Sequence, residues 1–383
     1  MVRTFHILTG EYPPDSGGVG DYTQLLALGL TARGCTVHVW SPGAVSSDDR
    51  GVHLHGLPDA FGAASRKVLE DGLAASPGCV LLQYVPNAVG ARGANLPFCF
   101  WLLRLRRRHA DIRVMFHEPY FYFSWGHPLG NVLAVLQRAM AAVLLRASGV
   151  AYLSTASWVP YLRPWNSSDT TLVVSPVPST IAGAAAPTEI ARWRARLLGG
   201  TRDAVVVGHF GTFGDHLAGQ LEPVIKVLLY THAPARFICM GRGSEAFVAG
   251  FNIRHPSLAP RMDATGPIPS GELAAALRAC DMVVQPYPDG VTTRRTTVMA
   301  ALANEVPTVS TDGALTEPVW HETGAVALAP ASNPRAIGGV VVGLLRDPAA
   351  RAALARAGRR TYDERFALDL TIDRLLSTAP VHP

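Results

Sequence analysis

Short apolar segments of strand length alternate with longer helical segments along most of this sequence. That alternation is typical of βαβ units, in which helices connect the strands of a parallel sheet. The pattern therefore predicts a doubly wound α/β domain in the first half of the chain. Its strands are expected at residues 4–9, 36–40, 79–84, 114–117, 149–153 and 171–174, and its helices at 22–33, 64–75, 96–109 and 129–147.

Small and turn-forming residues then interrupt the pattern, and the alternation resumes beyond them. In doubly wound sheets ligands bind beyond the carboxyl ends of the strands, so we expect two Rossmann-like domains with the site in a cleft between them. Further strands are predicted at 203–210, 235–240, 282–285 and 307–310, and further helices at 218–230, 270–278, 296–304 and 334–345. The predicted divisions are a first domain at 1–180, a linker at 181–202, a second domain at 203–360 and a C-terminal helical segment at 361–383.

The segment EYPPDSGGVGDYT follows the first predicted strand and precedes the first predicted helix. Gly17, Gly18 and Gly20 let a ligand approach the backbone closely, and Ser16 or Asp21 is placed to cap the helix. The glycine spacing is not the G-x-G-x-x-G of dinucleotide sites. A plain strand-to-helix turn is the alternative interpretation.

Two segments of the second domain also follow strands. In HFGTFGD, the backbone around Gly211 and the hydroxyl of Thr212 would form a nest for phosphate oxygens. In QPYPDGVTTRRTT, Arg294 and Arg295 precede a helix that begins at Thr296, where the helix dipole favours acidic residues. A bound anion explains the arginines, whose guanidinium groups suit phosphate. The alternative is a solvated arginine pair.

In the first domain, His117 ends a strand within the segment MFHEPY, where it is placed to hydrogen-bond a substrate hydroxyl. The alternative is a structural histidine, and His-Glu without a second histidine in helical register is no zinc motif. The aromatic run from Tyr120 to Trp125 predicts either a stacking wall for an acceptor or core beneath a loop.

The net charge of +5 comes almost entirely from arginine, which with abundant alanine, glycine and proline indicates a high-GC bacterial genome and no nucleic-acid partner. The cluster RLRRRH at 104–109 is either the last turn of a helix or a basic patch in weak peripheral contact with anionic lipid. The five dispersed cysteines are expected to be core residues. No signal peptide and no run of ~20 uninterrupted apolar residues is found, so a cytoplasmic protein is expected.

Five motifs together resemble the retaining glycosyltransferases of the GT-B fold, the family-4-like enzymes that use nucleotide-sugar donors. They are EYPPDSGGVGDYT, FHEPYF, HFGTFG, MGRGSE and RRTTVMAALANEVPTVSTDG, and the resemblance covers nearly the whole chain. It implies an α/β GT-B fold of two Rossmann-like domains facing across a cleft, with a final helix that crosses back to the first domain. It also implies a nucleotide-sugar donor, a sugar or natural-product acceptor, and no cofactor.

The resemblance also assigns roles to individual residues. It implies that Gly17, Gly18 and Gly20 lie near the donor phosphates and the acceptor, and that His117 contacts the transferred sugar. The diphosphate would be bound by Gly211, Thr212, Arg294, Arg295 and Thr296, and the nucleotide base would lie close to Gly241 and Gly243.

The sequence departs from the family pattern at two glutamates, whose places are taken by Thr292 and Ala300. We expect Asp289 to take the catalytic role of the first glutamate, and Glu317 or Glu322 to reach the ribose.

A second departure is the loss of the basic pair that the family has after its opening strand. Near their places stand His209 and Gly214, so we expect Arg294 and Arg295 to supply the charge.

The sequence predicts transfer of a sugar to an acceptor hydroxyl with retention. No Asp-x-Asp motif occurs, so glycine-loop amides, a helix N-terminus and arginines are expected to stabilise the leaving diphosphate without a metal. The alternative function is a non-catalytic nucleotide-sugar binding protein or a partner subunit of an active transferase. A sugar epimerase of the same fold would need more acidic and basic groups, and an oxidoreductase would need the dinucleotide fingerprint.

Overall fold

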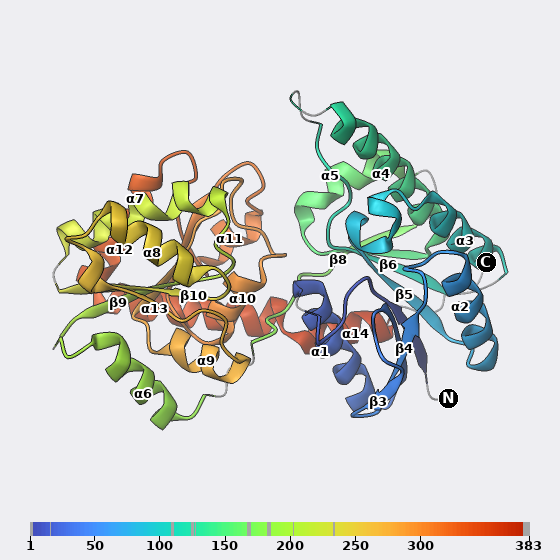
Figure 1. Ribbon diagram of the computed structural model, residues 1–383, viewed down its shortest axis with the longest axis horizontal. Coiled ribbons are helices and arrows are strands. Elements are labelled where there is room, and N and C mark those ends of the chain that lie inside the picture. Colours follow the sequence, from blue (N-terminus) through green and yellow to red (C-terminus); the bar gives the residue numbers. More distant parts are fainter. Residues whose placement is uncertain are drawn as a thin grey trace. The chain divides into compact units, whose positions relative to one another are not determined.

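The computed structural model describes residues 3–377, apart from residues 16, 109–110, 124–125, 127, 167–169, 182–184, 202 and 233. The chain forms two compact units (Figure 1). Unit 1 comprises Met1–Val177 and Leu368–Pro383, and unit 2 comprises Pro178–Ala367. Each unit is an α/β layer structure around one mainly parallel sheet, as the alternating pattern predicts.

The sheet of unit 1 has the strand order β3-β4-β2-β1-β5-β6-β7-β8 over the described residues, and only the β3–β4 pair is antiparallel. Every residue of β5 is buried, as expected for a central strand covered on both faces. The strands are β1 (Thr4–Leu8), β2 (Thr36–Pro42), β3 (Ser47–Asp49), β4 (Val52–Leu57), β5 (Cys79–Tyr84), β6 (Ile112–Phe116), β7 (Val150–Leu153) and β8 (Thr171–Val174).

Helices cover both faces of this sheet. One face packs against α1 (Gly18–Ala32) and α14 (Leu368–Ser377) through an apolar cluster that includes Phe5, Leu26 and Ile372. A second cluster packs the other face against α2 (Ala63–Ala75), α3 (Leu96–Arg107) and α4 (Pro128–Ala147), and α5 (Val159–Leu162) is a single turn.

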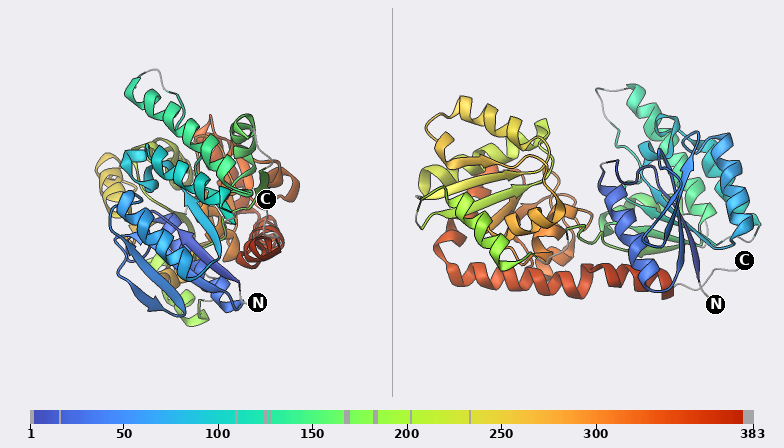
Figure 2. Two further views of the ribbon diagram at one scale, coloured as in Figure 1. Left: turned by 90° about the vertical axis from the view of Figure 1, so that its right-hand side faces the viewer. Right: turned by 60° about the horizontal axis from the view of Figure 1, so that its bottom comes forward.

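The sheet of unit 2 is parallel, with the order β11-β10-β9-β12-β13-β14 over the described residues. Helices α7, α8 and α12 pack on one face, and α6, α9 and α10 pack on the other (Figure 2). The strands are β9 (Val205–Phe210), β10 (Ala235–Met240), β11 (Met262–Ala264), β12 (Met282–Gln285), β13 (Thr308–Asp312) and β14 (Ala327–Pro330). The helices are α6 (Pro187–Leu198), α7 (Asp215–Thr231), α8 (Ser244–Arg254), α9 (Ser270–Arg278), α10 (Thr296–Ala303), α11 (Pro318–Thr323), α12 (Pro334–Arg346) and α13 (Pro348–Thr361).

The predicted linker at 181–202 is wrong over most of its length. It contains α6, whose Trp193 and Leu197 are buried in the core of unit 2. The small residues before Pro187 gave the segment its linker-like composition, although the helix that follows them has an apolar stripe of its own.

The C-terminal segment returns to unit 1, as the resemblance implied. After α13 comes a π-helical turn, Tyr362–Phe366, and then α14, which belongs to unit 1. There Arg33, the C-cap residue of α1, pairs with Asp369 and Asp373 of α14 at 2.9 and 2.7 Å.

The structure also places the five cysteines and the basic cluster that stood out in the sequence. All five cysteines are buried and free, which confirms their prediction as core residues. The basic cluster lies in the last turn of α3, while Phe98 and Leu102 of the same helix are buried. His109 of that cluster lies outside the described residues.

Helix α4 is long and apolar enough to cross a membrane by length and composition, and it is the only such helix among the described residues. Its second half is core, because residues from Met140 onward pack against the sheet. In both views of Figure 2 its first half projects past the sheet of unit 1. There Leu129, Val132 and Val135 are exposed by 86, 60 and 55%.

Candidate functional site

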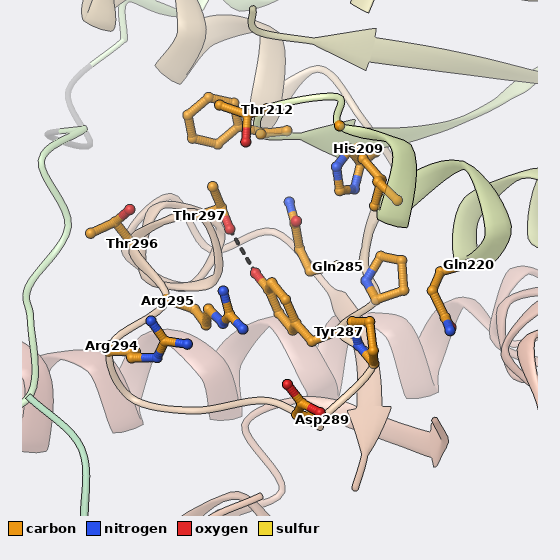
Figure 3. Close-up of a pocket in the computed structure, with 16 residues that line it drawn as sticks. His209, Thr212, Gln220, Gln285, Tyr287, Asp289, Arg294, Arg295, Thr296 and Thr297 are labelled. Atoms are coloured by element: carbon orange, nitrogen blue, oxygen red, sulfur yellow. Dashed lines mark hydrogen bonds between the residues drawn. The ribbon is translucent and has the colours of Figure 1, made fainter. Parts of the chain in front are cut away.

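Unit 2 holds a cavity of about 680 Å³ at the carboxyl ends of β9 and β12 (Figure 3). The first residues of α10 form one wall, and the start of α7 contributes another. Its lining residues are His209, Phe210, Gly211, Thr212, Gly214, Leu217, Gln220, Gln285, Pro286, Tyr287, Pro288, Asp289, Arg294, Arg295, Thr296 and Thr297.

The structure brings six of the predicted site residues together around this cavity. They are Gly211, Thr212, Asp289, Arg294, Arg295 and Thr296. Thr212 and Asp289 are exposed, whereas the two arginines are half-buried. A half-buried guanidinium beside a helix N-terminus gives an anion two sources of positive potential, the arginine charge and the unsatisfied first amides of the helix.

Tyr287 organises the arginine wall. Its hydroxyl is 2.7 Å from Oγ1 of Thr297, and the guanidinium carbon of Arg295 lies 4.4 Å from its ring centre (Figure 3). The Tyr287 backbone is fixed to β13, because Oγ1 of Thr311 accepts from its N–H at 2.8 Å and donates to its carbonyl at 2.7 Å. Burial raises the pKa of Tyr287, so it stays a neutral phenol at neutral pH.

The loop that carries the arginines is held by a buried acid. Glu317 accepts hydrogen bonds from the backbone N–H and, at 2.8 Å, from the hydroxyl of Thr293. Only 3% of Glu317 is exposed. This carboxylate is therefore committed to the loop and does not line the cavity, which argues against its expected contact with a ribose.

The other two acids expected to replace the family's glutamates are Glu322 and Asp289, and only one of them lines the cavity. Glu322 pairs with Arg365 at 3.7 Å outside the cavity lining, whereas Asp289 lies on the cavity wall. Thr292 and Ala300, at the family's glutamate positions, are buried and do not line the cavity. Among the lining residues whose side chains the structure describes, Asp289 is the one acid.

His209, at the place of a family arginine, is a cavity residue with a defined tautomer. Its Nδ1 lies 2.7 Å from the carbonyl of Val284, and because a carbonyl only accepts, Nδ1 carries the proton. Burial lowers the pKa of His209 to about 4, an effect that this hydrogen bond partly offsets. The ring is neutral at pH 7 and cannot replace the arginine charge.

The glycine loop of unit 2 is less of a phosphate nest than its sequence suggests. The N–H groups of Gly211 and Phe213 donate to the carbonyls of Met240 and Arg242, at 3.0 and 3.2 Å. Two of the expected amide donors are therefore used within the protein. The Thr212 hydroxyl, in contrast, points into the cavity (Figure 3).

Gly241 and Gly243, predicted near a nucleotide base, are not among the lining residues. Both have positive φ, at 109° and 85°, and a Cβ on Gly241 would stand 2.4 Å from the carbonyl oxygen of Gly211. These glycines let the two loops pack together, which is a structural reason for their presence.

In unit 1, the loop of Gly17, Gly18 and Gly20 encloses a carboxylate of the chain itself. Oε1 of Glu11 accepts from the N–H groups of Val19 and Gly20, each at 3.0 Å. A Cβ on Gly17 would stand 2.1 Å from this carboxylate, whereas a Cβ on Gly18 would meet nothing within 4 Å.

The first amides of α1 are therefore occupied by Glu11. The expected cap by Asp21 is wrong: it lies in the first turn of α1, where burial and then the charge of Glu11 raise its pKa. Ser16, the other expected cap, lies outside the described residues.

His117 is buried at the carboxyl end of β6, as expected for a residue that ends a strand. Its Nε2 is 2.7 Å from Oε1 of Gln83, and the edge of its ring meets Tyr22. Nearby, Tyr120 is buried with its hydroxyl on the Tyr161 carbonyl, but Tyr122 and Phe123 are about half-exposed, at 50 and 58%. The core interpretation thus holds for Tyr120, while the stacking wall stays a prediction, and Trp125 lies outside the described residues.

Sequence reasoning missed several residues that shape the cavity. Gln285 and Tyr287 line it without having been assigned a role, and the contact of Glu317 with Thr293 was not expected. Gln285 could have been found from its position in the sequence, because it is a polar residue at the end of an otherwise apolar strand. Among the described residues, no group of three acidic, histidine or cysteine side chains could hold a metal ion.

Residues 202–347 match the family model described as glycosyl transferases group 1. A search of curated protein sequences found no match. Similar solved structures include the sucrose-phosphate synthase of Thermosynechococcus elongatus, at 15% identity over 97% of both chains with a TM-score of 0.73. A glycosyltransferase of Rickettsia africae has 12% identity over 98% of this chain and 97% of its own, with a TM-score of 0.75. HepE of Anabaena, in complex with UDP and glucose, has 15% identity over 98% of both chains and a TM-score of 0.67.

At these identities the similar structures show the fold, while the family match covers most of unit 2, the unit that contains the cavity. The chain thus has the GT-B fold, and most of its unit 2 matches the group 1 glycosyltransferase model.

Proposed function

We propose that the protein transfers a sugar from a nucleotide-diphosphate donor to an acceptor hydroxyl, with retention and without a metal ion. The observation that carries this proposal is the pair Arg294 and Arg295 beside the first turn of α10, in a cavity of unit 2. HepE, which shares the fold, binds UDP and UDP-glucose, and this supports a nucleotide-sugar donor for the present chain.

The leaving diphosphate gains negative charge as the glycosidic bond breaks. Arg294, Arg295 and the N-terminus of α10 are the groups that would stabilise it. Thr212 and Thr296 would donate hydroxyl hydrogen bonds to the same oxygens. In this assignment the arginines replace the positive charge that neutral His209 cannot supply.

Retention follows if the acceptor hydroxyl attacks from the side on which the diphosphate leaves. The new bond forms between the acceptor oxygen and the anomeric carbon, the bond to the phosphate oxygen breaks, and the hydroxyl proton passes to that phosphate oxygen. No enzymic nucleophile is required. Asp289, on the cavity wall, is the acid that we propose to contact the donor sugar.

An assay with a panel of nucleotide sugars tests this function. Product analysed by NMR should keep the anomeric configuration of the donor, and EDTA should leave the rate unchanged. An inverted product or an absolute requirement for Mg²⁺ would overturn the proposed mechanism. Tight donor binding with no turnover on any acceptor would instead favour the alternative, a binding protein or partner subunit.

We also propose a weak contact of unit 1 with anionic membranes. Leu129, Val132 and Val135 form an exposed apolar stripe on α4, and exposed arginines end the neighbouring α3. No aspartate or glutamate occurs from residue 119 to 168, so the charge of this region suits an anionic lipid surface.

Cosedimentation with vesicles tests the membrane contact. Wild type should bind phosphatidylglycerol vesicles more than phosphatidylcholine vesicles, and the double variant Leu129→Ser/Val132→Ser should bind both poorly. Equal binding of wild type to the two lipids, or a change only in the oligomeric state of the variant, would contradict it.

A further inference from the structure

Gln285 is a buried amide at the floor of the unit 2 cavity. It ends β12 and has 0% exposure, and its side chain projects between Thr297 and His209 in Figure 3. Within the described part of the chain, neither its Oε1 nor its Nε2 has a hydrogen-bond partner. An unsatisfied buried polar group is destabilising, so an amide in the cavity with both of its polar atoms unpaired indicates a ligand.

His209 restricts what that ligand can be. Its Nδ1 donates to Val284, so Nε2 of the neutral ring is an acceptor, and a Cβ on Gly211 would stand 3.3 Å from it. Both His209 and Gln285 line the cavity. The floor therefore offers one acceptor from His209 and a donor and an acceptor from Gln285, with no charge.

A deprotonated phosphate does not fit such a floor, because its oxygens only accept and would face the lone pairs of Nε2 and Oε1. A pair of hydroxyl groups does fit, since each hydroxyl donates and accepts. The charged part of the donor belongs instead at the wall formed by Arg294 and Arg295.

We propose that Gln285 and His209 form a hydroxyl-binding subsite that selects a polyol part of the donor, its ribose or its transferred sugar. This inference rests on the proposed function and adds residues that set specificity. The cavity is then divided chemically, with a neutral floor for hydroxyls and a cationic wall for the diphosphate.

Isothermal titration with three classes of probe tests the subsite: inorganic pyrophosphate, the nucleoside diphosphates UDP, GDP and ADP, and their glucose conjugates. Gln285→Met keeps the length of the side chain and removes both hydrogen-bonding atoms. It should lower the affinity for the nucleoside diphosphate that wild type binds, or for its glucose conjugate alone, by about tenfold, as expected for the loss of two neutral hydrogen bonds. The affinity for pyrophosphate should stay unchanged. His209→Asn, which keeps a donor toward Val284 and removes the Nε2 acceptor, should act in the same direction.

These titrations distinguish the two groups that could supply the hydroxyls, the ribose and the transferred sugar. A loss already present with the nucleoside diphosphate identifies the ribose, and a loss confined to the glucose conjugate identifies the transferred sugar. Gln285→Met should also unfold at a higher temperature than wild type without ligand, because it removes two unpaired buried atoms. A merely structural glutamine would show lower stability instead.

Unchanged affinity of Gln285→Met for every nucleoside diphosphate and every glucose conjugate that wild type binds would overturn the subsite and leave the proposed function intact. An equal loss for pyrophosphate would also overturn it, since the effect would not depend on hydroxyls. If wild type binds no nucleotide and no nucleotide sugar, both the subsite and the proposed function fall.

Discussion

The guanidinium carbon of Arg295 lies 4.4 Å from the ring centre of Tyr287, and the hydroxyl of that tyrosine reaches Thr297 on the first turn of α10. The Arg295 guanidinium is thus stacked on a tyrosine that is held at its hydroxyl by Thr297 and at its backbone by Thr311. Stacking of this kind orients a guanidinium plane, which a lysine ammonium does not have.

Arg295→Lys keeps the charge but loses the stacking and the planar pair of donors. We expect it to raise the KM for the donor about five- to tenfold, in line with ~1 kcal/mol for a stacked cation and with the loss of bidentate phosphate binding. Steady-state kinetics measure the effect. Arg346→Lys, at an exposed position at the end of α12, is the matched control and should change nothing. Wild-type KM in Arg295→Lys would show that this side chain does not bind the donor.

The Glu317–Thr293 contact predicts a stability effect in unit 2. Hydrogen bonds to a buried carboxylate contribute about 1.5–3 kcal/mol each, so Glu317→Ala should lower the free energy of unfolding by several kcal/mol. Thr293→Val removes only the hydroxyl bond and should cost less. In a double-mutant cycle by chemical denaturation, additive losses would contradict a direct coupling of these two side chains.

Alanine substitutions at the neighbouring residues Gly17 and Gly18 should change stability in opposite directions. Gly17→Ala would place a methyl group on the Glu11 carboxylate and should destabilise unit 1 by about 1 kcal/mol or more. Gly18→Ala meets open space inside α1 and should stabilise the helix by roughly 0.5–1 kcal/mol.

Thermal unfolding of both alanine variants checks the prediction. If Gly18 also lies beside the acceptor, as the family resemblance implies, Gly18→Ala will raise the acceptor KM while the protein becomes more stable. Destabilisation by both substitutions would argue against the Glu11 explanation for the loop.

A histidine ladder in unit 1 predicts acid sensitivity. His6, His38 and His53 lie side by side on β1, β2 and β4, and Nδ1 of His38 is 2.9 Å from Nε2 of His55. Burial, followed by the charges of His6, His55 and His53, lowers the pKa of His38 from 6.5 to about 4, while Asp48 opposes this shift.

The unfolded chain protonates His38 more readily than the folded chain does. The free energy of unfolding of unit 1 should therefore be highest above pH 6.5 and should fall between pH 6.5 and about 4. Denaturation midpoints measured from pH 6.5 to 4 test whether stability falls with pH. His38→Phe should flatten the decline, and His232→Phe in unit 2 should not. Stability that rises as the pH falls from 6.5 to 4 would contradict the ladder interpretation.

The sequence predicted the layers of both units because buried parallel strands are continuous apolar runs, as in β5 and β9. It missed β4, whose segment VHLHGL carries the ladder histidines and reads as too polar for a strand. Histidines stacked against Trp40 and one another pack like an apolar surface, which local polarity does not reveal.

Part of the candidate site was also predictable. Arg294 and Arg295 stand out because positive charges at a helix start contradict local preference, whereas Asp289 was expected only from the family resemblance. Glu317 and Gln285 do not stand out in this way. Their importance depends on long-range contacts, with Thr293 in one case and with an unfilled cavity in the other.

The proposed function depends on the cavity of unit 2 binding the diphosphate of a nucleotide sugar through Arg294 and Arg295. Isothermal titration of UDP, GDP and ADP into wild type and into the double variant Arg294→Ala/Arg295→Ala tests it most directly. At least one nucleotide should bind wild type, and the double variant, folded as judged by circular dichroism, should lose about 100-fold or more in affinity. Equal affinity of wild type and a folded double variant would contradict it.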